Sequence, residues 1–258
     1  MSAQDTVSFG FETVTPAEKV DRVKGVFRSV ASKYDVMNDF MSAGVHRLWK
    51  HDTMNRLNPQ PGERHLDVAG GTGELGRAFL KRADAAGKRR GDTCQATAIV
   101  CDINDAMLEA GKARKDNAVW GDRLNWVCAD GTALPYPDRS FDALTISFGI
   151  RNFADRIAGL KEFRRVLKPG GRLAVLEFSQ MTAPMLQKAY DAYSFAVIPE
   201  VGKIVTGDRD SYKYLVESIR QFPDQDAFKA EIDSAGFSNV SITNFSGGIA
   251  ALHFGWAI

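Results

Sequence analysis

The chain has 258 residues, 44% of them hydrophobic and 25% charged, which is enough to bury a substantial core. Its 33 Lys and Arg nearly balance 32 Asp and Glu, at a formal charge of +1. No bulk electrostatic field therefore favours nucleic acid or an anionic membrane, and we expect no nucleic-acid partner. No apolar run reaches the ~20 residues that span a bilayer.

The cysteines and the first residues indicate a reducing compartment. The three cysteines contain no CxxC pair, and Cys101 and Cys128 lie in apolar runs, so we expect both to be buried, inert thiols. Residues 1–10 lack the charged and then apolar segments of a secretory signal. We therefore expect a cytoplasmic protein.

The first part of the chain is predicted to be helical. Residues 1–14 are predicted to be a loose leader, and Thr15-Pro16-Ala17-Glu18 is a capping box with proline at the first helical position. Apolar residues three or four apart then predict an amphipathic helix: Val20, Val23, Phe27 and Val30. A second helical stretch, from about Asp35 to Leu57, ends at the breaker segment 58–62.

From Arg64 onward, apolar runs alternate with helical patterns. The predicted strands are His65–Ala69, Ala96–Cys101, Leu124–Cys128, Phe141–Ser147 and Arg172–Phe178. The predicted helices between them are Glu74–Ala86, Ala106–Asn117 and Asp155–Leu167, and 85–93 is expected to be a polar surface loop. This order predicts a parallel sheet with helices on both faces.

The remaining residues complete the fold prediction. Residues 180–222 are rich in aromatic residues and are predicted to be helical, and a helix at 226–235 precedes two strands, 237–245 and 249–256. We therefore predict an α/β fold: a Rossmann-like, seven-stranded, mostly parallel sheet with an N-terminal helical cover, a helical insertion and a C-terminal β-hairpin. The single domain divides into a helical cover (1–62), a cofactor-binding core (63–179), an insertion or lid (180–222) and a C-terminal helix and hairpin (223–258).

The segment from His65 to Glu74, HLDVAGGTGE, predicts a cofactor site. A short apolar strand carries an acid, breaks into glycines and leads directly into a helix. Because glycine has no Cβ, a ligand can approach the backbone N–H groups of this turn. The pattern indicates a nucleotide or nucleoside cofactor.

Two cofactors fit this turn. Residues 71–76 match the GxGxxG pattern of NAD sites, and Asp102 ends the next strand, where a ribose-binding carboxylate belongs. S-adenosylmethionine is favoured because Asp67, Asp102 and Asp130 lie at the ends of three successive strands. Its sulfonium and amine are cationic, and several acids suit them but would repel a diphosphate. Singly, each acid could equally be a helix N-cap or loop-end carboxylate.

Seven segments carry a family resemblance: Tyr34–Lys50, Leu66–Gly73, Thr145–Asn152, Arg165–Gly171, Leu176–Ser179, Ala189–Phe195 and Asp210–Leu215. The chain resembles the class I S-adenosylmethionine-dependent methyltransferases, and more narrowly the ubiquinone/menaquinone biosynthesis C-methyltransferase family. Tyr34–Lys50 and Ser147–Asn152 are the segments specific to that family. Two departures are Glu74, where the family usually has Asp, and a longer segment at 85–95.

The resemblance implies methyl transfer to a ring carbon of a polyprenylated benzoquinol, 2-methoxy-6-polyprenyl-1,4-benzoquinol, and in some members of a demethylmenaquinol. The prenyl tail implies peripheral contact with the inner face of the membrane or with a quinone-biosynthesis complex, and a homodimer is left open. A small-molecule NAD-dependent oxidoreductase is the alternative function. The candidate cofactor-binding residues are Asp67, Gly70, Gly71, Thr72, Gly73, Asp102, Ile103, Asp130, Gly131 and Ser147.

Arg151, Asn152 and Tyr34 are the candidate catalytic residues. Arg151 and Asn152 follow the fourth strand, at the edge where cofactor and acceptor should meet. Because arginine is almost never deprotonated, we expect Arg151 to stabilise a phenolate or polarise a water, with Asn152 orienting the quinol oxygen. The alternatives are a structural ion pair for Arg151 and ordinary packing for Tyr34.

We predict no metal site. His46 and His51 are five residues apart, off the helical spacing of paired ligands, and they lack a third partner. His65 and His253 lie in strand patterns and are expected to be core or edge residues. The segment 185–205 is expected to be a lid, a tail groove, a membrane face, a dimer surface or a cap over the core.

Overall fold

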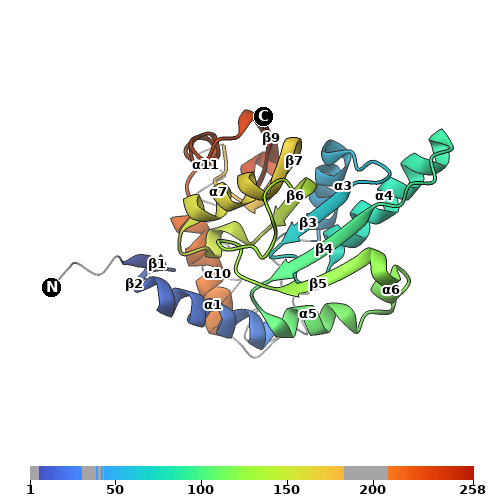
Figure 1. Cartoon of the computed structure of the whole chain (residues 1–258). Coiled ribbons are helices and arrows are strands. Elements are labelled where there is room, and N and C mark those ends of the chain that lie inside the picture. The colour runs from blue at the N-terminus through green and yellow to red at the C-terminus, as the bar shows by residue number, and fades with distance from the viewer. Residues whose placement is uncertain (1–5, 31–38, 40–41, 43, 183–208) are drawn as a thin grey trace.

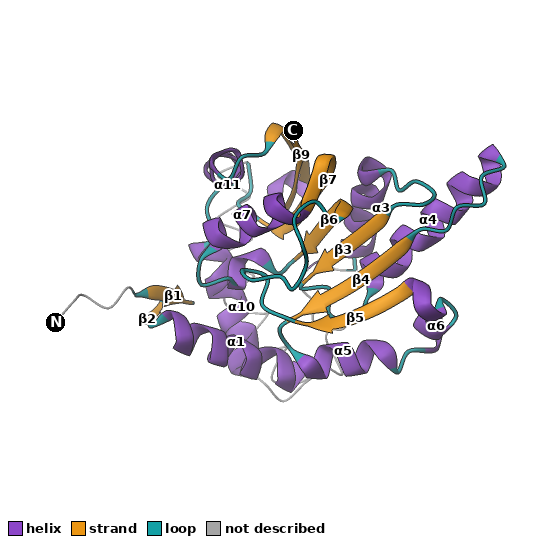
Figure 2. Ribbon diagram, in the orientation of Figure 1, coloured by secondary structure: helices purple, strands orange, loops and turns teal. Residues whose placement is uncertain are grey.

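The computed structural model describes residues 6–30, 39, 42, 44–182 and 209–258. Its centre is a seven-stranded sheet in the order β5-β4-β3-β6-β7-β9-β8 (Figure 2). The strands are β3 (Arg64–Val68), β4 (Thr97–Asp102), β5 (Leu124–Cys128), β6 (Phe141–Ser147), β7 (Leu167–Phe178), β8 (Ser238–Phe245) and β9 (Ala250–Ala257). The five strands β5, β4, β3, β6 and β7 are parallel, and β9 runs antiparallel between β7 and β8. The predicted mostly parallel α/β sheet is confirmed.

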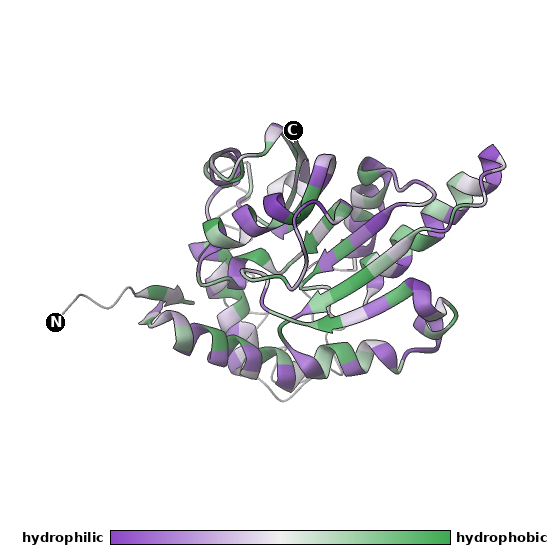
Figure 3. Cartoon of the chain, in the orientation of Figure 1, coloured by the Kyte–Doolittle hydropathy of each residue, from purple (hydrophilic) through white to green (hydrophobic). Residues whose placement is uncertain are grey.

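Helices cover both faces of this sheet (Figure 1). One face of the sheet packs against α3, α4 and α5 to form a first core, and the other face packs against α7 and α11 to form a second core. Successive side chains of a strand point to opposite faces, so Val100 enters the first core and Cys101 the second. Figure 3 shows that hydrophobic residues gather along the central strands. These helices are α3 (His46–Leu57), α4 (Glu74–Arg90), α5 (Asp105–Lys112), α7 (Arg156–Val166) and α11 (Gln225–Ser234), with the short α6 (Lys115–Ala118) after α5.

The strand register brings the carboxyl ends of three strands together. Val68 of β3 pairs with Cys101 of β4 on one side and Ile146 of β6 on the other. The segments that follow these strands therefore meet at one edge. The chain order also reverses there, between β3 and β6, which is the usual position of a ligand site in such sheets.

The N-terminal segment confirms one prediction and corrects another. The capping box forms, since Thr15 N donates to Glu18 Oε2 at 2.8 Å, and α1 (Pro16–Val30) follows. The predicted loose leader is wrong over its second half, where β1 (Val7–Phe9) and β2 (Glu12–Val14) form an antiparallel hairpin. The Phe9 ring stacks on Tyr214 with centroids 4.1 Å apart, which gives this short hairpin a tertiary anchor.

Two further predictions are wrong. The segment 85–93 is not all loop, because α4 continues to Arg90 and ends at Gly91 in a left-handed conformation (φ 68°). Residues 85–90 contain no proline, the buried Gly87 is accommodated within the helix, and Gly91 supplies the αL cap. Cys128 is exposed rather than buried, because β5 lies at the edge of the sheet, whereas Cys101 is fully buried.

The C-terminal part follows the predicted order. Helix α10 (Arg209–Gln221) lies within the predicted helical insertion, of which residues 183–208 fall outside the described residues. Strands β8 and β9 form the predicted hairpin, joined by a turn at Ser246–Gly248. His65 and His253 are buried, as predicted.

None of the helices in the described part of the chain is long and apolar enough to cross a membrane.

Candidate active site

The glycine turn after β3 has a geometry that other residues would disturb. A Cβ on Gly70 would lie 2.8 Å from the backbone oxygen of Asp67, and one on Gly73 would lie 2.6 Å from the Trp126 ring. Gly71 and Gly73 also adopt left-handed conformations, with φ of 54° and 78°. The turn therefore presents bare backbone at the carboxyl end of β3, as the sequence predicts.

Asp67 holds this turn to the neighbouring strand. Its Oδ1 accepts a hydrogen bond from Thr145 Oγ1 at 2.7 Å, and its Oδ2 accepts one from Gly76 N at 3.2 Å. Burial raises the pKa of Asp67 to about 7, and these two hydrogen bonds oppose the rise. His65 contacts Thr145 Oγ1 at 2.9 Å and extends the network inward. Both oxygens of Asp67 are thus engaged by the protein itself.

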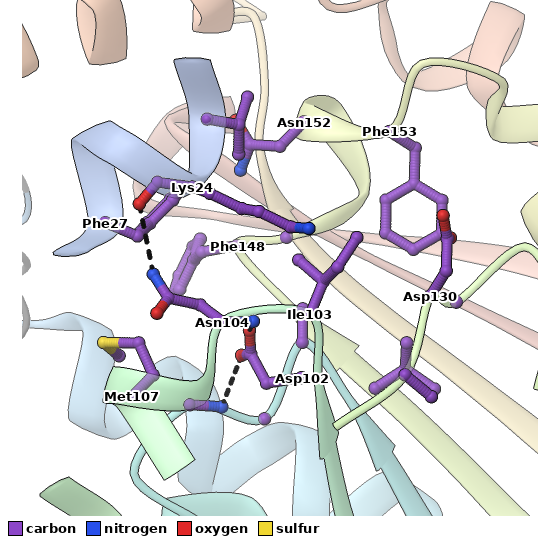
Figure 4. A pocket seen from close by; sticks show the side chains of 18 of the residues that line it. Lys24, Phe27, Asp102, Ile103, Asn104, Met107, Asp130, Phe148, Asn152 and Phe153 are labelled. Carbon is purple, nitrogen blue, oxygen red and sulfur yellow. Dashed lines mark hydrogen bonds between the residues drawn. The ribbon is translucent and has the colours of Figure 1, made fainter. Parts of the chain in front are cut away.

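Asp102 connects the turn to β4. Its Oδ2 accepts from Gly71 N and its Oδ1 from Asn104 N, both at 2.9 Å (Figure 4). Burial raises the pKa of Asp102 to about 6, against the lowering effect of these N–H donors. Asn104 in turn donates to the backbone oxygen of Lys24 at 3.3 Å, which ties α1 to the strand end.

A cavity of about 370 Å³ opens over these strand ends. Such a volume lies within the usual range for small-molecule sites. The predicted cofactor-binding residues that line it are Asp67, Gly70, Gly71, Thr72, Asp102, Ile103, Asp130, Gly131 and Ser147. Asn152 lines it as well, whereas Gly73 and Arg151 do not. Tyr34 lies outside the described residues.

Helix α1 covers this cavity from the side opposite the strand ends. Its residues Val20, Val23, Lys24 and Phe27 line the wall, and Figure 4 shows Lys24 extending from the helix into the cavity. Sequence periodicity correctly predicts the apolar face of this helix. It does not show that the face covers a ligand space, because a core and a cavity wall require the same pattern.

Asn152 faces the cavity and is held from α10. Tyr214 Oη donates to Asn152 Oδ1 at 2.9 Å, and the Tyr214 ring stacks on Phe9 of the N-terminal hairpin. One side of the Asn152 amide therefore faces Tyr214, and Figure 4 shows Asn152 among the residues that line the cavity. No local pattern around Asn152 predicts this partner, because it lies 62 residues further along the chain.

Arg151 points away from the cavity into a buried ion pair. Its Nη1 donates to Glu177 Oε1 at 2.7 Å and to the backbone oxygen of Phe148 at 2.6 Å. The two charged side chains are 2% and 1% exposed. Burial raises the pKa of Glu177, and the charge of Arg151 counteracts that rise. The described residues therefore place Arg151 in the structural ion pair that sequence analysis gave as its alternative.

A second ion pair, which the sequence did not predict, lines the cavity itself. Lys50 Nζ lies 2.6 Å from Glu74 Oε2, at the end of the cavity near the start of α4. Lys50 belongs to one of the resemblance segments and Glu74 to the glycine turn. A lysine on a helix of mixed polarity offers no signal of such a partner 24 residues away.

The residues of the cavity fit an adenosine-containing methyl donor. The buried Ser147 hydroxyl lines the cavity and has no hydrogen-bond partner among the described residues, so a ligand could supply one. The cavity wall contains Asp67, Glu74, Asp102 and Asp130, an acidic set that favours a cationic ligand over a diphosphate.

Comparison with known proteins decides the family. The model of the ubiE/COQ5 methyltransferase family matches residues 13–257. The chain belongs to this family. The ubiquinone/menaquinone biosynthesis C-methyltransferase UbiE of Cereibacter sphaeroides is 56% identical over 254 residues, which cover 98% of each chain. The protein of that name from Roseobacter denitrificans is 54% identical, over 98% of this chain and 97% of its own.

Solved structures support the fold of this methyltransferase. A S-adenosylmethionine-dependent methyltransferase of Thermotoga maritima, described as a possible histamine N-methyltransferase, aligns with a TM-score of 0.59 at 17% identity, covering 91% of this chain and 99% of its own. The [4+2]-cyclase SpnF aligns with a TM-score of 0.62 at 18% identity, covering 89% and 76%. At such identities the likeness concerns the fold alone.

Proposed function

We propose that the chain methylates a ring carbon of a polyprenylated benzoquinol, 2-methoxy-6-polyprenyl-1,4-benzoquinol, with S-adenosylmethionine as the methyl donor. The observation that carries this proposal is the acid-lined cavity over the glycine turn, in a chain of the ubiE/COQ5 methyltransferase family. The named relatives are C-methyltransferases of ubiquinone and menaquinone biosynthesis, which supports a quinone-type acceptor. A demethylmenaquinol is proposed as a second acceptor.

The strand-end residues are proposed to bind the adenosine part of the donor. Asp102 offers the carboxylate that ribose hydroxyls can donate to, and its orientation is set by Gly71 and Asn104. Asp130 sits at the end of β5, where Thr132 N and Oγ1 both donate to its Oδ1 at 2.8 Å. Ile103 and Gly131 flank these acids and shape the cavity wall. Ser147 supplies the free hydroxyl described above.

When bound, S-adenosylmethionine supplies an electrophilic methyl group to a ring carbon made electron-rich by a neighbouring phenolate. The protein must then exclude water, orient the ring and stabilise the phenolate charge. Helix α1 lines one wall of the cavity with apolar residues and is proposed to limit the access of water to the bound acceptor. Asn152 is proposed to orient the quinol oxygen, because its amide lines the cavity and is held by Tyr214. Tyr34 is kept as a further candidate for acceptor contact.

Arg151 is proposed to act through position rather than by contact with the acceptor. Its guanidinium is bound to Glu177 and to the backbone of Phe148, and Phe148 and Asn152 both line the cavity. The ion pair therefore holds the backbone segment from which these two cavity residues project. This assignment replaces the direct phenolate contact that the sequence suggested for Arg151.

An acceptor with a polyprenyl tail partitions into bilayers, so we propose that the chain contacts the membrane surface peripherally. Sedimentation with liposomes that contain a long-chain quinol tests this proposal. Sedimentation of the chain with quinol-loaded liposomes is the expected result, and its complete retention in the supernatant would reject peripheral contact.

A steady-state assay tests the acceptor. Purified protein is supplied with labelled S-adenosylmethionine and either the 2-methoxy-6-polyprenyl-1,4-benzoquinol or a demethylmenaquinol, each reduced and oxidised. We expect label in the reduced acceptors, because the quinone form has no hydroxyl to deprotonate. Absence of transfer to either quinol, despite cofactor binding, would contradict the proposal. Oxidation of NADH with either quinone as the electron acceptor would instead support an NAD-dependent oxidoreductase.

A further inference from the structure

The Lys50–Glu74 ion pair lies at the end of the cavity, and the Lys50 ammonium has N–H donors that no described residue accepts. Lys50 reaches the cavity from α3, and Glu74 is the first residue of α4, directly after the glycine turn. Among the described residues, Glu74 is the hydrogen-bond acceptor of the Lys50 ammonium. An ammonium carries three N–H donors, so two remain for a ligand.

Burial makes these remaining donors consequential. The Lys50 side chain is 9% exposed and lies 5.9 Å from the centre of the Phe148 ring. Burial alone would raise the pKa of Glu74, but the charge of Lys50 holds it below its ordinary value, so Glu74 carries its negative charge at neutral pH. The Glu74 side chain is 34% exposed, so the pair is partly buried, and it contributes little to stability because desolvation of the charges offsets their attraction. Such a pair on a cavity wall is instead well placed to bind a charged ligand.

The sheet order shows which end of the ligand would reach this pair. Asp102 ends β4 and Asp130 follows β5 by two residues, both on one side of β3, and they are the proposed adenosine contacts. Lys50 belongs to α3, which packs against β7 on the other side of β3. A donor whose ribose lies at Asp102 would therefore extend its amino-acid end across the glycine turn toward Lys50.

The charges of that end complement the ion pair. The methionine part is a zwitterion, with a carboxylate and an ammonium on adjacent atoms. Asp67, the other acid near the turn, is 1% exposed and accepts from Thr145 and Gly76, whereas the Glu74 side chain is 34% exposed and open to a ligand. We propose that Lys50 binds the carboxylate of the methionine part of S-adenosylmethionine and that Glu74 binds its ammonium. This inference rests on the proposed function and assigns a residue pair to the amino-acid end of the donor.

Titration calorimetry with two ligands tests it without turnover. One ligand is S-adenosylhomocysteine, and the other is S-adenosyl-3-thiopropylamine, which lacks only the carboxylate. We expect the wild-type protein to bind S-adenosylhomocysteine about tenfold or more tightly than the thiopropylamine, because a charge-assisted hydrogen bond to the carboxylate is strong. In Lys50→Met this preference should fall to about twofold or less, because the carboxylate loses its partner.

Two further variants make the result specific. Lys24→Met removes the other lysine of the cavity wall and should leave the preference for the carboxylate unchanged. Lys50→Met with Glu74→Gln removes the unpaired charge that the single variant leaves, and it carries the test if Lys50→Met does not fold. The preference should be lost in this double variant too.

The outcomes separate the two proposals. If the Lys50 variants weaken both ligands by the same factor, or keep the wild-type preference, the assignment of Lys50 is overturned. If the wild-type protein binds neither ligand, the proposed function itself fails.

Discussion

The two sides of the cavity are built differently. On the side that we propose binds adenosine, Asp102 and Asp130 each accept from the backbone N–H of the residue two positions later, Asn104 and Thr132. On the side that we propose binds the acceptor, Asn152 is held by Tyr214, 62 residues away, and Arg151 by Glu177, 26 residues away. One side is therefore built mainly from local turns at strand ends, with one bond from Gly71 N that links Asp102 to the glycine turn. The other depends on tertiary packing.

This difference predicts how each side responds to change. Local turns should tolerate distant substitutions and fail when their own backbone is altered. Groups held by tertiary partners should fail, or be rescued, together with those partners.

The largest effect on ligand binding is expected at the glycine turn. Gly70→Ala places a Cβ 2.8 Å from the backbone oxygen of Asp67, which cannot move without distorting β3. We expect S-adenosylhomocysteine to bind about 100-fold more weakly, in line with the cost of overpacking. Isothermal titration calorimetry measures this change.

Gly25→Ala is the matched control for the turn. Gly25 lies in α1, and a Cβ there would meet nothing within 4 Å. This variant should bind normally and melt at the same or a higher temperature, because alanine favours helices by about 1 kcal/mol over glycine. Normal binding by Gly70→Ala would show that the turn does not touch the cofactor.

The next effect concerns the buried ion pair. Arg151→Gln leaves Glu177 buried without its partner, and we expect the free energy of unfolding to fall by about 3 kcal/mol. Adding Glu177→Gln should restore most of that stability, because two neutral amides replace two charges. Urea denaturation of both variants measures the difference.

The same pair separates positioning from catalysis. If Arg151 acts through position, turnover should recover in the Arg151→Gln, Glu177→Gln variant along with stability. A double variant that is folded and binds S-adenosylhomocysteine normally, yet has lost turnover by orders of magnitude, would place Arg151 in the chemistry after all.

A pH effect of intermediate size is expected on the adenosine side. Because burial raises the pKa of Asp102 to about 6, the carboxylate is protonated below that pH in the ligand-free protein. Ribose hydroxyls donate to the ionised form, so affinity for S-adenosylhomocysteine should fall as pH decreases below 6, by up to about tenfold per unit for one linked proton. Asp102→Asn should bind weakly at all pH values and with a flatter profile. An equally steep profile in that variant would assign the effect to another group.

The raised pKa of Asp102 affects protein stability in the opposite direction from ligand affinity: stability falls as the pH rises. A carboxyl group with a higher pKa in the folded state is stabilised by protonation, so its favourable contribution is present at low pH. That contribution is lost as pH rises through about 6, the folded pKa of Asp102. In the ligand-free protein, Asp102→Asn should therefore raise the melting temperature more at pH 8 than at pH 5.

The smallest effect is expected at Tyr214. Tyr214→Phe keeps the ring stacked on Phe9 and removes the hydroxyl that donates to Asn152. The loss of one hydrogen bond costs about 1 kcal/mol, so we expect turnover to fall about fivefold. Affinity for S-adenosylhomocysteine should not change. A matching loss of cofactor affinity would contradict the division of the cavity into two sides.

The same contrast explains what the sequence could predict. Strand ends, glycines and acids follow local rules, and so the turn and the cavity positions of Asp102 and Asp130 were predictable from the residues alone, whereas Ser147 came from the family resemblance. The partners of Asn152 and Lys50 were not, because helices α10 and α3 can pack on the sheet in many ways that share one hydrophobic pattern. The N-terminal hairpin was missed because its short strands depend on the contact of Phe9 with Tyr214.

The most direct test of ring methylation is the position of the transferred methyl group. The protein is incubated with S-adenosylmethionine that carries a trideuterated methyl group and with the reduced 2-methoxy-6-polyprenyl-1,4-benzoquinol, and the product is fragmented by mass spectrometry. We predict one trideuterated methyl group on a ring carbon, retained after cleavage of the ether groups. Label on an oxygen, or an unlabelled acceptor in the presence of bound cofactor, would contradict the proposed reaction.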